Sequence, residues 1–178
     1  MATKILRALF VLAAFASVTG CATNPIFVAP DAEGKPAAIR GYDAVGYRTD
    51  GKPVVGRPEF THRWQGADWR FASAANRDTF ASEPQRYAPQ YGGYCAYGAA
   101  NGFKVSTEPA AFTIDGGKLY LNYSIPVRNT WNKDRARYIQ KADAKWPTLA
   151  GEAYETEEKA VARTKAKQAT RPTGTDQP

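Results

Sequence analysis

The stretch FTHRWQGADWRFASAANRDTFASE, residues 60–83, sets the pattern of secondary structure in the middle of the chain. Aromatic and β-branched residues lie on both sides of QGAD, residues 65–68, and this arrangement predicts a β-hairpin. Ser73 is a good N-cap residue, so we expect a short helix over residues 74–83, ended by Pro84. A hairpin that leads directly into a helix indicates mixed secondary structure.

The segment that follows, residues 87–104, is dense in tyrosine and glycine. The pair Gly92-Gly93 predicts a sharp turn, or a close approach of two backbones, just before Cys95. Residues 111–123, AFTIDGGKLYLNY, predict a second hairpin, because DGGK is strong turn chemistry between two apolar runs.

A longer amphipathic helix is expected to close the domain, capped by Ser124 and ending at Trp146-Pro147. Residues at helical spacing form its apolar stripe, which Asp134 interrupts. The order of strands, helix, loop, strands and helix predicts a small, single α+β domain with two β-hairpins.

The ends of the chain differ from this central part. Residues 1–20 have Lys4 and Arg7 before an apolar run that is too short to span a bilayer, as in a secretory signal peptide. Residues 21–38 are small and contain proline, which favours a flexible tether. We expect the folded domain at 39–149, and a charged tail that is partly helical or disordered at 150–178.

The apolar run ends in VTGC, residues 18–21, which resembles the lipobox of bacterial lipoproteins. The resemblance implies that Cys21 is acylated and becomes the first residue of the mature protein. Residue 22 is alanine rather than aspartate, which by the sorting rule of such proteins favours the outer membrane. The predicted location is therefore the outer membrane, lipid-anchored and facing the periplasm.

Composition narrows the possible chemistry. The formal net charge is +7, of which Lys4 and Arg7 carry two, and the remaining basic residues are too scattered for a nucleic-acid surface. The chain contains two cysteines and one histidine, so one chain cannot build a zinc site of the usual Cys and His type. With Cys21 acylated, Cys95 has no disulfide partner, and either a working thiol or a packed apolar residue fits the sequence.

The sequence offers further candidate site residues besides Cys95. His62 alternates with aromatic residues on a predicted strand, where it fits either a packing role or that of a metal ligand. Asp43 fits turn capping or a bond to a tyrosine. Several tyrosines could line a pocket or belong to the core and its rim, namely Tyr42, Tyr47, Tyr87, Tyr91, Tyr94 and Tyr97.

Residues 39–149 resemble the YHS domain, and more narrowly the bacterial envelope subgroup of YHS domain-containing (seleno)proteins. The motifs that carry the resemblance are GYDAVGY at 41–47, FASAANRDTFASEPQRYAPQYGGYCAYG at 71–98, LYLNY at 119–123 and KADAKWP at 141–147. Metal-handling relatives carry cysteines where this chain has Gly46, Ala72 and Ala75 or Asn76. The resemblance therefore does not transfer their metal site, whereas selenocysteine at the position of Cys95 in the subgroup implies a working thiol.

These observations lead to three hypotheses for function. In the first, the domain binds a soft, copper-type metal ion or a redox partner through Cys95, with His62 as a second metal ligand. In the second, the protein is a thiol-dependent oxidoreductase that uses Cys95, although no resolving cysteine is present. In the third, it is a structural or interaction protein of the envelope and Cys95 is inert. The sequence leaves the oligomeric state open.

Overall fold

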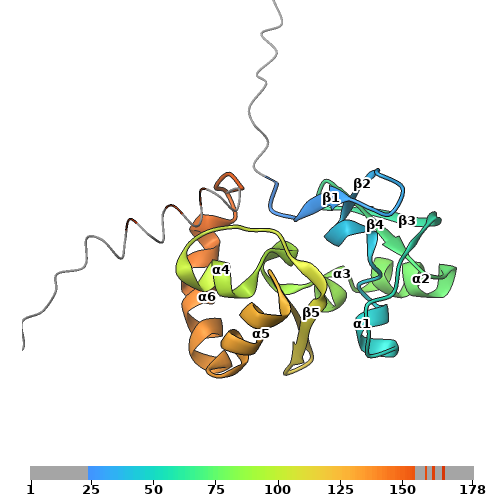
Figure 1. Cartoon of the computed structure of the whole chain (residues 1–178). Helices are drawn as coiled ribbons and strands as arrows, with labels where there is room; N and C mark the ends of the chain where they lie inside the picture. Colours follow the sequence, from blue (N-terminus) through green and yellow to red (C-terminus); the bar gives the residue numbers. More distant parts are fainter. Residues whose placement is uncertain (1–23, 155–158, 160–161, 163–165, 167–178) are drawn as a thin grey trace, which may run out of the picture.

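The computed structural model describes residues 24–154 together with Lys159, Ala162 and Ala166, and it confirms the predicted α+β class (Figure 1). Six α-helices and three two-stranded antiparallel sheets lie within these residues. None of the helices described is long and apolar enough to cross a membrane. The elements follow one another as β1 (Val28–Pro30), β2 (Pro36–Ala38), the 3-10 turn η1 (Ile39–Gly41), α1 (Gly46–Thr49), β3 (Arg57–Trp64), β4 (Ala67–Phe71), α2 (Ala74–Ser82), α3 (Pro84–Tyr87), the 3-10 turn η2 (Gln90–Gly93), α4 (Ala96–Asn101), β5 (Glu108–Asp115), β6 (Lys118–Asn122), α5 (Ile125–Asn132) and α6 (Arg135–Leu149).

Both predicted hairpins form, and each has a short turn at the expected place. Gln65 and Gly66 connect β3 to β4 with positive φ at both residues, the geometry that matches the twist of a two-residue hairpin. Gly116 and Gly117 connect β5 to β6 in the same way. In each hairpin the pairing shifts register near the start of the first strand, just after a proline that cannot donate a ladder hydrogen bond.

The helices agree with the sequence in part. Ser73 caps α2 as predicted, since its Oγ accepts a hydrogen bond from the backbone N–H of Asn76 at 3.1 Å. Pro84, expected only to end that helix, also begins α3. The single C-terminal helix is a wrong prediction: Asp134 has φ −149° and ψ 54°, which ends α5 and starts α6. Pro147 lies inside α6, which continues to Leu149.

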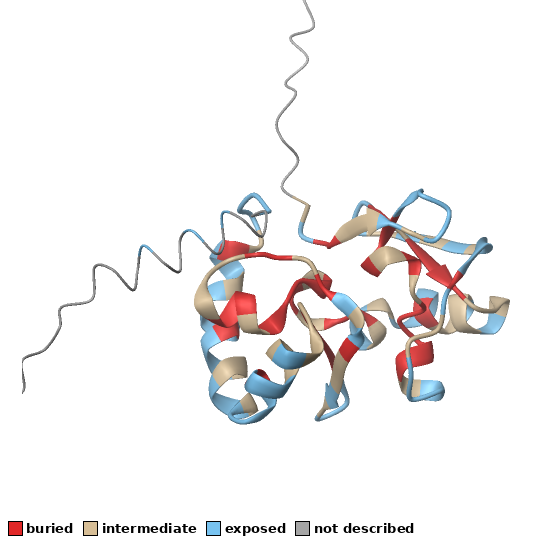
Figure 2. Cartoon of the chain, viewed as in Figure 1, coloured by how far each residue is buried: buried red, intermediate tan, exposed pale blue. Residues whose placement is uncertain are grey.

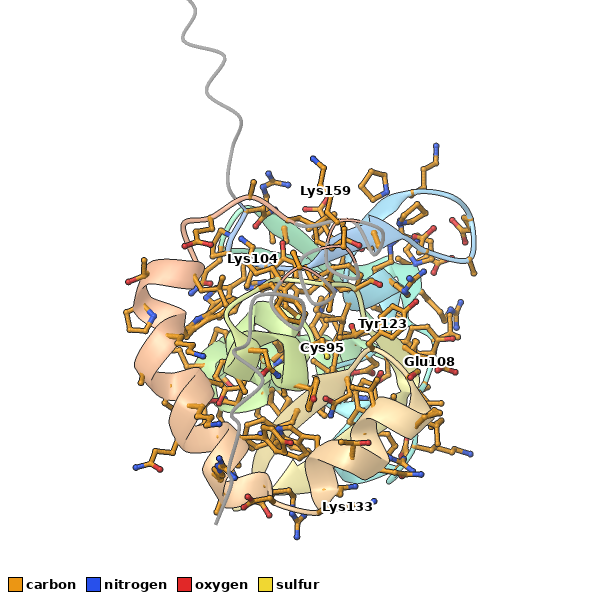
Figure 3. All side chains as sticks on the ribbon, turned by 60° about the vertical axis from the view of Figure 1, so that its left-hand side comes forward. Cys95, Lys104, Glu108, Tyr123, Lys133 and Lys159 are labelled. Atoms are coloured by element: carbon orange, nitrogen blue, oxygen red, sulfur yellow. The ribbon has the colours of Figure 1, made fainter. Side chains whose placement is uncertain are left out.

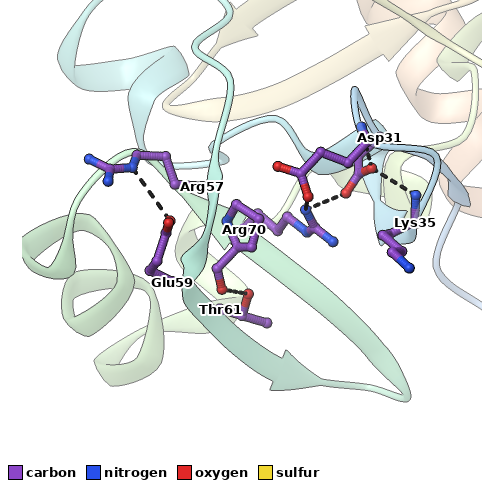
Figure 4. A network of polar contacts seen from close by, with 8 residues as sticks. Asp31, Lys35, Arg57, Glu59, Thr61 and Arg70 are labelled. Atoms are coloured by element: carbon purple, nitrogen blue, oxygen red, sulfur yellow. Dashed lines mark hydrogen bonds and ion pairs between the residues drawn. The ribbon is translucent and has the colours of Figure 1, made fainter.

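The predicted tether is also corrected for the part that the structure describes. Ile26 and Phe27 are only 2% and 4% exposed, and β1 and β2 form a third hairpin. Figure 4 shows how its loop is held: Asp31 accepts hydrogen bonds from the backbone of the loop and forms an ion pair with Arg70 of β4. The folded unit therefore includes residues 24–38, and Cys21 with the proposed signal segment lies outside the described residues.

The buried residues gather into two main clusters, one in each half of the domain (Figures 1 and 2). One cluster lies among β2, β4, α1 and α2 and includes Trp69, Phe71 and Phe80. The other lies among η2, α4, β6, α5 and α6 and includes Tyr120 and Trp131. Cys95 belongs to a small third cluster with Val105, beside the second one.

Candidate functional site

Cys95 lies two residues after the Gly92-Gly93 turn and is 1% exposed. Gly92 has φ +59°, and a Cβ at this position would lie 1.8 Å from the carbonyl oxygen of Pro25. The turn thus allows the close backbone approach expected from the sequence, and the approaching backbone is the N-terminal segment. Partly buried side chains, among them Tyr97, Phe103 and Tyr123, surround the small cluster of Cys95 and Val105.

The sulfur of Cys95 takes the place of an N-cap oxygen. Its Sγ accepts hydrogen bonds from the backbone N–H of Gly98 in α4 at 3.4 Å and of Tyr123 at 3.3 Å. Burial raises the pKa of the Cys95 thiol, and the N–H groups of Gly98, Tyr123 and Tyr97 oppose this rise only in part. The structure therefore favours a neutral thiol that ties the start of α4 to the end of β6.

Asn122 completes this arrangement, and sequence reasoning missed it. The residue is fully buried at the end of β6, and its Oδ1 accepts a hydrogen bond from the backbone N–H of Tyr97 at 3.2 Å. The same Oδ1 lies 3.7 Å from Sγ of Cys95, so the thiol can donate to it. An amide directly after three apolar residues of a strand was the one signal available in the sequence.

His62 lies away from Cys95. It is half-buried on β3, opposite Trp69 in the register, and its ring centre lies 6.1 Å from that of Phe80. Phe80 belongs to the first main cluster and Cys95 to the third. Figure 1 shows β3 and α4 in opposite halves of the domain. The predicted metal ligands Cys95 and His62 are therefore not brought together in this structure.

Asp43 is fully buried and fully hydrogen-bonded. One carboxylate oxygen accepts from the backbone N–H groups of Val45 and Gly46 at the start of α1. The other accepts from the backbone of Ala72 and from the side-chain amide of Asn76. Of the two roles left open by the sequence, the structure shows turn capping, and Asp43 also joins this turn to the start of α2.

Three of the candidate tyrosines belong to the core. Tyr47, Tyr91 and Tyr94 are each at most 5% exposed. Their hydroxyls donate to the carbonyl of Pro109, to the carboxylate of Asp143 and to the carbonyl of Asn24 respectively. Burial raises the pKa of all three, to about 12 for Tyr94. Each hydroxyl thus has a hydrogen-bond partner within the fold, and Tyr91 and Tyr94 line two different hollows.

The remaining candidates lie at the rim. Tyr97 packs against Tyr138 with 5.1 Å between ring centres, and burial raises its pKa. Tyr87 lies under the guanidinium groups of Arg48 and Arg86. Tyr42 is half-buried and lines a surface hollow of about 640 Å³, which Tyr123 also lines. In the view of Figure 3, Tyr123 lies between the buried Cys95 and Glu108, which lines the same hollow.

The described residues contain no group of three or more His, Cys, Asp or Glu side chains that could hold a metal ion. Around Cys95 the hydrogen-bonding groups are backbone N–H groups and an asparagine amide, and among the described residues no acid, base or cation bonds to Sγ. Such surroundings stabilise a packed thiol and supply neither a metal ligand set nor a proton acceptor.

Comparisons with protein-family models, with curated proteins and with solved structures found no match to this chain. The resemblance to the YHS domain therefore stays a prediction that rests on the motifs quoted above.

Proposed function

We propose that the protein is a non-catalytic interaction module of the bacterial envelope, anchored in the outer membrane by acylated Cys21, in which Cys95 is a structural residue. The observation that carries the proposal is the burial of Cys95, with its sulfur hydrogen-bonded by the backbone of two separate elements. Its raised pKa also supports a neutral thiol at physiological pH.

The two thiol-based hypotheses find less support. A copper-type metal ion needs Cys95 and a second ligand within bonding distance, and His62 packs against Phe80 instead. A thiol oxidoreductase needs an accessible thiolate, whereas Cys95 is 1% exposed. Both hypotheses would require the cluster around Cys95 to open.

The rate of alkylation of Cys95 tests the proposal. We would use the Cys21→Ala variant in a non-ionic detergent, so that Cys95 is the only thiol, and compare folded with urea-unfolded protein. We expect alkylation of the folded protein only at the rate of its unfolding, and no stoichiometric binding of Cu(I). Rapid alkylation of the folded protein would overturn the proposal in favour of a working thiol, if the rate rises with pH around a thiol pKa below the free value of about 8.5.

The membrane anchor is tested separately by mass spectrometry of the mature N-terminus. We expect an acylated N-terminal peptide that begins at Cys21 in the wild type, recovered with the outer membrane. The Cys21→Ala variant should lack the acyl groups and leave the membrane fraction. An unmodified Cys21 in the mature wild-type protein would contradict the lipoprotein part of the proposal.

A further inference from the structure

Arg40 lies in a backbone conformation that arginine rarely adopts. Ile39, Arg40 and Gly41 have φ values of 43°, 59° and 75°, so three consecutive residues are left-handed. This region is disfavoured for any residue with a Cβ, and most strongly for β-branched isoleucine. The fold holds the turn in place because Ile39 is buried in the first main cluster.

The side chain of Arg40 is held through its Nε atom and through a contact with an aromatic ring. Its Nε donates to the backbone carbonyl of Thr107 at 3.1 Å, and its guanidinium carbon lies 5.8 Å from the ring centre of Phe27. Neither Nη atom has a hydrogen bond or an ion pair with any residue in the described part of the chain. The guanidinium is therefore fixed in direction, with its two terminal nitrogens available to a ligand.

Arg40 lines the hollow of about 640 Å³ together with three residues that carry hydroxyl groups, Tyr42, Ser106 and Ser124. The hydroxyls of Tyr42 and Ser106 have no hydrogen-bond partner among the described residues. Ser124 accepts from the backbone of Val127 as the cap of α5, and its own proton is free to be donated. One cationic residue and three residues with hydroxyl groups thus line a common hollow.

The same arginine also lines a second hollow, of about 420 Å³, beside the point where the described chain begins. Asn24, Phe27 and Tyr94 line this hollow as well. Only residues 22 and 23 separate Asn24 from Cys21, a distance of at most roughly 10 Å for an extended chain. An acyl anchor on Cys21 would therefore hold Arg40 close to the lipid headgroups.

We infer that Arg40 is the centre of a binding site for a phosphate group. The two Nη atoms form a fork that matches two phosphate oxygens, and the hydroxyls of Tyr42, Ser106 and Ser124 donate to the others. The phosphate belongs either to a phospholipid headgroup or to a soluble phosphorylated molecule. The inference deepens the proposed interaction function, and its headgroup form rests on the proposed anchor at Cys21.

Glu108 also lines the 640 Å³ hollow and is exposed. Its negative charge opposes a phosphate, so the ligand is held by direct contact with Arg40 rather than by a broad positive field. The Glu108→Gln variant should consequently bind phosphate more tightly than the wild type.

We would titrate inorganic phosphate into the full chain in non-ionic detergent micelles at constant ionic strength. Nuclear magnetic resonance would record the Nε–H signal of Arg40 and the backbone N–H signals of Tyr42 and Ser106, and the backbone signals report binding in Arg40→Gln as well. A saturable shift is expected, with the affinity lowered at least tenfold in Arg40→Gln. Tyr42→Phe and Ser106→Ala should each lower it several-fold. Arg63→Gln is the matched control, since Arg63 is exposed on β3 and pairs with Asp68, and its affinity should equal that of the wild type.

The source of the phosphate is distinguished in lipid nanodiscs without added phosphate. A shift of the Arg40 signal in phosphatidylglycerol discs, absent in discs of an uncharged galactolipid, assigns the site to a headgroup. A shift with inorganic phosphate, together with no shift in the phosphatidylglycerol discs, assigns the site to a soluble ligand.

No saturable shift from either source, or binding that Arg40→Gln leaves unchanged, overturns the inference. If Arg40→Gln does not fold, unchanged binding by both Tyr42→Phe and Ser106→Ala overturns it. The reactivity of Cys95 is measured separately, so this failure is distinguishable from a failure of the proposed function.

Discussion

At the scale of single residues, the role of Cys95 follows from what its sulfur contacts rather than from its chemical type. An accessible free cysteine in an oxidising compartment is readily oxidised or forms a mixed disulfide. Here the sulfur is buried and accepts two backbone N–H groups, from Gly98 and from Tyr123. Its hydrogen bonds connect α4 to the chain that follows β6, so we expect replacement to lower stability.

The Cys95→Ala variant should be less stable by about 1–3 kcal/mol, because both N–H groups lose their acceptor inside the protein. Cys95→Ser should lose less, since its hydroxyl can still accept a hydrogen bond. Urea denaturation of the three proteins measures these differences. An equal loss in the two variants would contradict the hydrogen-bonding role and leave only the loss of packing.

Buried tyrosines should control the stability of the protein at alkaline pH. Burial raises the pKa of Tyr94 from 10.0 to about 12, and it also raises the pKa values of Tyr47 and Tyr91. Above pH 10 the unfolded chain releases these protons while the folded chain retains them, so the free energy of unfolding falls as pH rises. Below pH 10 the tyrosines cause no such dependence.

Urea denaturation at several pH values between 8 and 12 measures this effect. The midpoint should decrease steadily above pH 10, and less steeply in Tyr94→Phe, which retains the buried ring. Tyr154→Phe is the control, because Tyr154 is 46% exposed. Lysines titrate in the same pH range, but both variants retain all of them, so a difference in slope between the two variants comes from the tyrosines. An identical slope in the wild type and in Tyr94→Phe would show that Tyr94 does not carry the dependence.

At the scale of elements, the 3-10 turn η2 joins the two halves of the domain to the N-terminal segment. Gly92 accepts a hydrogen bond from the backbone N–H of Phe27 at 2.8 Å, and its missing side chain leaves room for Pro25. A side chain at the next residue, Gly93, would lie 2.5 Å from the side chain of Ile39. The two glycines are therefore required by neighbours that are distant in the sequence.

The Gly92→Ala variant should be destabilised by about 3 kcal/mol or more, because its Cβ would overlap the backbone of Pro25. Gly117→Ala is the matched control: its φ is also positive, at 72°, but nothing lies within 4 Å of the added Cβ. We expect about 1 kcal/mol for this control. Thermal unfolding compares the two, and equal losses would mean that the N-terminal segment does not pack tightly on η2.

At the scale of the whole molecule, contacts between the two ends of the described chain close the domain. The side chain of Lys104 is 1% exposed, and its Nζ donates to the carbonyl of Asn24 at 3.4 Å and to that of Ala150 at 3.2 Å. Burial lowers the pKa of this lysine. Tyr154, beyond the end of α6, lies over Phe27 with 6.5 Å between ring centres. The N-terminal residues are thus part of the fold.

A chain shortened to begin at residue 39 should therefore lose cooperative unfolding, whereas a chain that begins at residue 24 should retain it. The shorter chain lacks the β1–β2 hairpin, the buried residues Ile26 and Phe27, and the partner of Arg70. Removing one partner of a buried ion pair leaves an uncompensated charge. Differential scanning calorimetry of both chains checks this, and a cooperative transition in the shorter one would support the tether predicted from the sequence.

The sequence predicted the elements whose signals are local. Both central hairpins and α2 formed where turn residues and Ser73 indicated them, because turns and caps depend on neighbouring residues. The N-terminal hairpin was missed, since its strands are three residues long and have no periodic pattern. The break at Asp134 was missed because the helical spacing of apolar residues continues across it.

By itself, the sequence determined the α+β class, the positions of two hairpins and the glycine turn before Cys95. Only the tertiary structure decided that Cys95 is buried beside Asn122, that His62 packs elsewhere, and that Arg40 lines a hollow. The physical reason is separation along the chain: Cys95 and Asn122 are 27 residues apart, and Arg40 and Thr107 are 67 apart. Burial, pKa and ligand geometry depend on such contacts, which local patterns do not encode.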